Sequence, residues 1–167
     1  MSSRASRSGG RSDPDPARQI RVLLDSFRES WNCLLVLLVD RGGPVLSGAG
    51  SPGDVDPLSL ASVASAHFSA SAQLASRLGG GEFTTLLHRG GRRSVLLVDV
   101  GGVAVLTALF GEGLPSERTV REAGGVAAQL EEPTRGLVSG GKPGGGISME
   151  WVTAAEREID RIFRDEA

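Results

Sequence analysis

Cysteine, histidine and aromatic side chains are scarce in this chain, and the shortage excludes several classes of protein. Its 167 residues include one cysteine, two histidines, two tryptophans, five phenylalanines and no tyrosine. One cysteine cannot form an internal disulfide, and with two histidines it cannot build a Cys/His zinc site. The sequence therefore predicts no disulfide and no metal site, and it leaves the core to aliphatic side chains.

Long apolar runs and an excess of one charge are also missing. The longest unbroken apolar run is residues 33–39, whereas a helix that spans a bilayer needs about 20 residues, so we expect no membrane span. The arginines near the N-terminus are not followed by an apolar stretch, so we expect no signal peptide and a cytoplasmic protein. The net charge of −2 argues against general binding to nucleic acid.

Glycine is abundant instead, with 24 residues that mostly separate periodic segments. They help to divide the chain into an arm at 1–16, a domain at 17–132, a flexible linker at 133–147 and a C-terminal amphipathic helix at 148–167. The arm is expected to be disordered because it has no core-forming residue. Gly124 and Gly125 fall inside a predicted helix, where we interpret them as a point of close packing.

The periodicity of the 17–132 domain predicts three helices and five strands. Helices are expected at 17–32, 58–78 and 116–132, and strands at 33–39, 44–47, 82–88, 94–100 and 103–110. The links between the last three strands are too short for a parallel crossover, so these neighbours must be antiparallel. Strands that are apolar on both faces need helices on both sides. The expected fold class is therefore α/β, a three-layer sandwich around a five-stranded antiparallel sheet.

The helix at 58–78 carries unusually little charge. One half of it is predicted to face the core and comprises Leu60, Val63, Ala64, His67, Phe68, Leu74, Ala75 and Leu78. The opposite half comprises Ser62, Ser65, Ala66, Ser69, Ala72, Gln73, Ser76 and Arg77. Small uncharged side chains let another backbone approach closely, so we interpret this second half as a contact face. The alternative is a solvated face that has drifted to serine and alanine.

Several strings of the sequence, in this order, resemble one family. They are LLVLLVDRGGPVLSGAG in the first hairpin, SLASVASAHFSASAQLASRLGGGEF across the charge-poor helix, LLHRGG at the end of the third strand, and the terminal REIDRIFRDEA. Together they resemble the roadblock (dynein light chain) superfamily, and within it the bacterial mutual gliding-motility regulators of a small Ras-like GTPase. The resemblance covers residues 18–132 and extends to the C-terminal helix.

The resemblance implies a roadblock/profilin-like fold and a homodimer in which the third strands pair, with Phe83, Thr85 and Leu87 at the interface. It implies a cytoplasmic GTPase-activating protein, acting in bacterial cell polarity and gliding motility, that has no catalytic residues of its own and no cofactor. The GTPase would bind the contact face, where Gln73 departs from the smaller residue that is usual in the family. The C-terminal helix would contact a partner through Val152, Ile159, Ile162 and Phe163. A dimeric scaffold that binds a GTPase or its co-regulators without changing hydrolysis is the alternative.

Other motifs are interpreted as structural. Residues 136–142 fit the start of a phosphate-binding loop, but Pro143 stands where a Ser or Thr would hold magnesium, so this stretch is expected to be linker. Cys33 is expected to be a small hydrophobe and His67 and His88 to be structural. Arg77 is expected to pair with acidic partner residues rather than to act as an arginine finger. The sequence offers no polar pocket signature for a small-molecule substrate.

Overall fold

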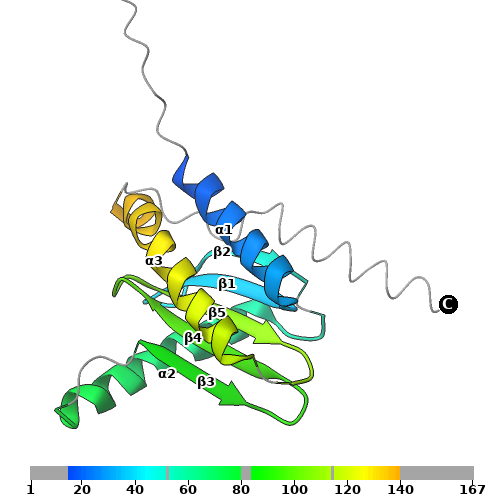
Figure 1. Ribbon diagram of the computed structural model, residues 1–167. Coiled ribbons are helices and arrows are strands. Elements are labelled where there is room, and N and C mark those ends of the chain that lie inside the picture. Colours follow the sequence, from blue (N-terminus) through cyan, green and yellow to red (C-terminus); the bar gives the residue numbers. More distant parts are fainter. Residues whose placement is uncertain (1–14, 52, 80–83, 114, 140–167) are drawn as a thin grey trace, which may run out of the picture.

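A five-stranded antiparallel sheet organises the chain, with helices on both of its faces (Figure 1). The computed structural model describes residues 15–51, 53–79, 84–113 and 115–139. The strands are β1 (Leu35–Asp40), β2 (Val45–Gly50), β3 (Thr85–Arg89), β4 (Ser94–Val100) and β5 (Ala104–Phe110), in the order β2-β1-β5-β4-β3. The helices are α1 (Pro16–Trp31), α2 (Pro57–Arg77) and α3 (Glu117–Ser139). The predicted three-layer α/β sandwich is confirmed.

The sheet separates two apolar cores. Alternate residues of β1 and β5, such as Val36 and Leu106, face α1 and α3, which lie together on one side (Figure 1). Their neighbours, such as Leu37 and Val105, face α2 on the other side. All seven residues of β5 are buried, because a central strand with a helix layer on each face has no exposed side. This explains the apolar run at 33–39.

The last described helix is longer than its sequence pattern predicts. α3 continues past Glu132 to Ser139 and carries Pro133 in its interior. A proline normally ends a helix because it lacks an N–H and crowds the preceding turn. Here the ring of Pro133 is buried, and the Thr134 hydroxyl donates to the Leu130 carbonyl at 2.6 Å, so packing outweighs the lost backbone bond. The linker predicted from 133 thus begins in helix, and its remainder, the C-terminal helix and most of the arm lie outside the described residues.

The interpretation of the two α3 glycines as a packing point is wrong. Gly124 and Gly125 are exposed, and a Cβ atom built on either would meet nothing within 4 Å. The buried stripe of α3 is formed by other residues, including Ala123, Ala127 and Leu130. No close contact among the described residues explains the glycine pair.

Candidate partner-binding surface

Helix α2 begins at a strong N-cap. The Asp56 carboxylate accepts hydrogen bonds from the backbone N–H groups of Leu58 and Ser59, at 3.3 and 3.1 Å, and from the Ser59 hydroxyl. The hydrogen bonds from Ser59 hold the pKa of Asp56 below its usual value. Pro57 follows at the first helical position, where its missing N–H costs nothing. The start of α2 is therefore fixed by local sequence.

The face that α2 turns to the sheet differs from the predicted one. Its buried residues are Ala61, Ala64, Ser65, Phe68 and Ala75. These are mostly small, because the sheet beneath already supplies large leucine and valine side chains, so the helix settles close to it. Ser65, predicted to face outward, is 6% exposed and points to the sheet.

A polar contact reinforces this orientation of α2. The Ser65 hydroxyl donates to the Arg41 carbonyl at 2.7 Å, across 24 residues of sequence. The Arg41 guanidinium lies 4.9 Å from the centroid of the Phe68 ring and forms an ion pair with Asp99, whose side chain is 14% exposed. Ser65 and Phe68 thus meet the same arginine, and this cluster ties α2 to the β1–β2 turn and to β4.

The rest of the predicted contact face lies at the surface. Ser62, Ala66, Gln73, Ser76 and Arg77 are exposed, and Ser69 and Ala72 are half-buried. We call these seven residues the serine-alanine face. Arg77 is the only charged residue among the 21 of α2. A bare, charge-poor helix surface of this kind suits close approach by a partner.

Large apolar side chains predicted to lie in the core are instead exposed beside that face. Val63 is 64% exposed, Leu74 53% and Leu78 69%, and His67 is also exposed. Together with half-buried Leu60 they form the apolar stripe of α2. Of the eight large apolar side chains exposed in the described part of the chain, four lie on α2 or at its C-cap and one, Leu87, on β3. Exposed apolar surface of this kind is typical of surfaces that bind other proteins.

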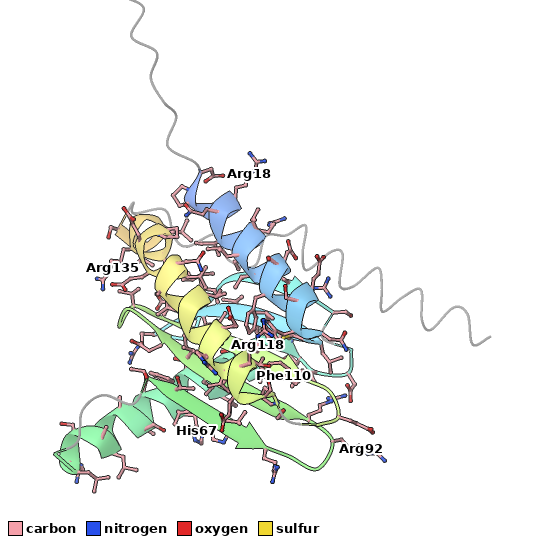
Figure 2. The ribbon with its side chains drawn as sticks, in the orientation of Figure 1. Arg18, His67, Arg92, Phe110, Arg118 and Arg135 are labelled. Carbon is pink, nitrogen blue, oxygen red and sulfur yellow. The ribbon has the colours of Figure 1, made fainter. Side chains whose placement is uncertain are left out.

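Strand β3 forms the sheet edge next to this stripe. It pairs with β4 on one side, and no described strand pairs with its other side. Thr85 is half-buried and Leu87 is 42% exposed, while Phe83 lies outside the described residues. His67 of α2 (Figure 2) approaches His88 of β3, with ring centroids 4.2 Å apart and planes at 82°. The apolar stripe and the open edge of β3 thus adjoin.

The described residues contain no large cluster of side chains that commonly bind metal ions. No three His, Cys, Asp or Glu side chains gather there, and none of the described helices could cross a membrane. A pocket of about 430 Å³ lies between the end of α1 and the start of α3. Two of its hydroxyls, Ser116 and Thr119, hydrogen-bond to each other at 2.8 Å as part of the α3 cap. Cys33 is buried, and burial raises the pKa of its thiol to about 12.

Several solved structures have a fold similar to that of this chain. The structure is similar to Myxococcus xanthus MglB, with 29% identity over 70% of this chain and 87% of that chain, and a TM-score of 0.64. A structure described as MglB with tetrameric arrangement is 25% identical over 74% and 93% of the two chains, with a TM-score of 0.65. The gliding protein MglB from Thermus thermophilus, at 23% identity over 74% and 93%, shares the fold with a TM-score of 0.64. No curated protein matches the sequence.

The sequence profile of the Roadblock/LC7 domain matches residues 20–110, from the first buried residue of α1 to the end of β5. The match therefore spans the whole sheet and α2, the elements that carry the apolar stripe and the serine-alanine face. This chain belongs to the Roadblock/LC7 domain family.

Proposed function

We propose that the chain is a regulator, without an active site of its own, that binds a small Ras-like GTPase as a homodimer and stimulates GTP hydrolysis. The observation that carries this proposal is the serine-alanine face of α2. This face lies at the surface, yet Arg77 is its only charged residue. The similarity to MglB structures supports it. An exposed helix face usually carries charged residues, because these are soluble and form helices better than serine.

The two surfaces of α2 suit two different partners. At about 100° per residue, Ser69 and Gln73 lie on average roughly 140° around the helix from Leu74 and Leu78. The apolar stripe lies toward β3, because His67 within it touches His88. A second copy would cover the stripe and extend the sheet at β3, through Thr85 and Leu87. The serine-alanine face would remain available to the GTPase.

The sequence of the apolar stripe is self-complementary for an antiparallel pair of α2 helices. Turning the helix end for end about residue 69 would set Leu60 opposite the second copy's position 78, and Val63 opposite position 75, next to Leu74. His67 then faces position 71, a serine, which leaves room for the ring. The large side chains interdigitate at spacings of three and four residues, as in paired helices elsewhere.

The chemistry of hydrolysis would stay with the GTPase. Phosphoryl transfer is catalysed by positioning and charge stabilisation, so a partner can accelerate it by holding the GTPase's own catalytic residues in place. Arg77 stands at the end of the serine-alanine face, where it can pair with an acidic residue on the partner's surface. The stripe Val152, Ile159, Ile162 and Phe163, outside the described residues, would add a second contact.

Single-turnover GTP hydrolysis tests the proposal. A Ras-like GTPase encoded in the same genome is loaded with GTP and followed with and without saturating amounts of this chain. We expect hydrolysis to accelerate at least tenfold. Measurable binding with an unchanged rate would reject activation and select the scaffold alternative.

A single substitution tests the assigned face. Ser69→Arg places a large charge at the centre of the serine-alanine face, so we expect GTPase binding to weaken at least a hundredfold while the dimer persists. The matched control is Glu122→Arg, at an exposed position of α3 on the opposite layer. Equal affinity of the Ser69→Arg variant and the wild type, measured by calorimetry, would show that the GTPase binds elsewhere.

A further inference from the structure

The two histidines of the chain, His67 and His88, lie 21 residues apart in sequence, but their side chains are in contact. His67 lies at the middle of α2 and His88 near the end of β3, and both side chains are exposed. Their rings lie edge to face with centroids 4.2 Å apart. Neither ring is buried in a core, so both are accessible from outside the chain.

The geometry of the pair suits a shared metal ion. Neutral imidazole is a common ligand of zinc, with Zn–N bonds of about 2.0–2.1 Å in a tetrahedral arrangement. Two imidazoles on one tetrahedral ion have ring centroids about 5 Å apart. The observed 4.2 Å separation therefore has to grow by only about 1 Å, which side-chain rotation can supply at the surface.

The two arginines nearest the pair in sequence point elsewhere or lie farther along the helix. Arg89 follows His88 in β3, and the alternation of a strand places it on the other face of the sheet. Arg77 lies ten residues after His67, about 15 Å farther along α2. A divalent cation at the two rings would therefore not be repelled by the arginines nearest in sequence.

One chain supplies only two ligands, and a second copy can supply the others. In the antiparallel pairing of α2 helices, the two copies of position 67 lie about four residues, or 6 Å, apart along the helix axis. The residues beside His67 on this surface, Ala70 and Ser71, are small, so the two rings can approach each other across the pair. Each ring also brings its own His88 to the same place.

We propose that His67 and His88 bind a zinc-like divalent transition metal ion at the dimer interface, with imidazoles from both copies as ligands. The inference rests on the homodimer of the proposed function, but not on the GTPase. Metal binding would stabilise the dimer by mass action, because the complete site exists only when two chains are paired. The site departs from the expectation of no metal, which counted the ligands of one chain.

Zinc titration of the full, tag-free chain tests this site. Calorimetry with Zn²⁺ alone is expected to give one ion per two chains, and sedimentation velocity a shift from monomer to dimer at low protein concentration. His67→Gln and His88→Gln are each expected to weaken zinc binding at least tenfold, while Glu122→Gln, at an exposed carboxylate of α3, binds as the wild type does. Mg²⁺, which prefers oxygen ligands, is expected not to bind.

Three results would overturn the proposal. They are the absence of saturable zinc binding below about 100 µM, an affinity that neither histidine variant changes, and one ion per chain with no shift toward dimer. The Co²⁺ complex gives an independent readout, since tetrahedral coordination has a visible spectrum that the two variants should lose. GTP hydrolysis enters none of these measurements, so failure of the metal site is distinguishable from failure of the GTPase proposal.

Discussion

At the scale of single residues, burial decides chemistry. Cys33 follows the left-handed cap of α1 at Asn32 and is 3% exposed. Burial favours the neutral thiol and raises its pKa from 9.0 to about 12, with only a smaller opposing effect from Arg28. A thiol held neutral at physiological pH is a poor nucleophile. The sequence-based interpretation of Cys33 as a small hydrophobe agrees with this environment.

The raised pKa of Cys33 predicts a loss of stability in alkali. Between pH 9 and about pH 12 the unfolded chain releases the thiol proton and the folded chain keeps it, so the free energy of unfolding falls as pH rises. Urea denaturation at pH 8 and pH 10.5 should show a smaller fall in Cys33→Ala than in the wild type. Equal falls in the two proteins would contradict the assignment.

Ser65 shows a second effect of burial. Its buried hydroxyl donates to the Arg41 carbonyl, and Ser65→Ala is expected to reduce the free energy of unfolding by about 1 kcal/mol. Ser62→Ala, at an exposed position one turn earlier, is the matched control and should change it by less than about 0.5 kcal/mol. Thermal or urea unfolding measures both. A neutral Ser65→Ala variant would mean that the hydrogen bond contributes nothing net.

At the scale of elements, α3 is the helix whose local sequence opposes its structure. It contains Gly124, Gly125 and Pro133, each unfavourable in a helix interior, yet it runs to Ser139. Its buried stripe against α1 and the sheet outweighs these local preferences. When tertiary packing sets the end of a helix in this way, the capping and helix-breaking residues of the sequence do not predict where the helix ends.

The open space around Gly124 and Gly125 predicts that alanine at either position stabilises the fold. Gly124→Ala and Gly125→Ala should each raise the free energy of unfolding by about 0.5–1 kcal/mol, because alanine restricts the unfolded chain and meets no neighbour. Gly101→Ala is the contrasting variant, since φ there is +55° and a Cβ atom would collide with Glu131. It should destabilise. Urea denaturation measures all three variants, and destabilisation by Gly124→Ala would contradict the open space found around this residue.

At the scale of the whole molecule, exposed apolar surface is concentrated on α2 and its C-cap, which carry four of the eight large apolar side chains exposed among the described residues. We expect Leu74→Glu to make the proposed dimer monomeric, because it places a charge in the apolar stripe. The fold should be kept because Leu74 is 53% exposed. Val22→Glu on α1, 59% exposed on the opposite layer, should leave the dimer intact. Sedimentation equilibrium measures both, and a dimeric Leu74→Glu variant would place the interface elsewhere.

The order of the elements, the three layers and the shortage of charge on α2 are predictable from the sequence alone. Periodicity suffices for these, because strands as apolar as β1 and β5 can lie only between two layers. Which side of α2 meets the sheet becomes clear only from the packing of the folded chain. Apolar residues occur nearly all around this helix, so its hydrophobic pattern has no single direction, and the choice depends on fit. A sheet crowded with leucine and valine accepts the small side chains of Ala61, Ala64 and Ser65, and this leaves Val63, Leu74 and Leu78 exposed.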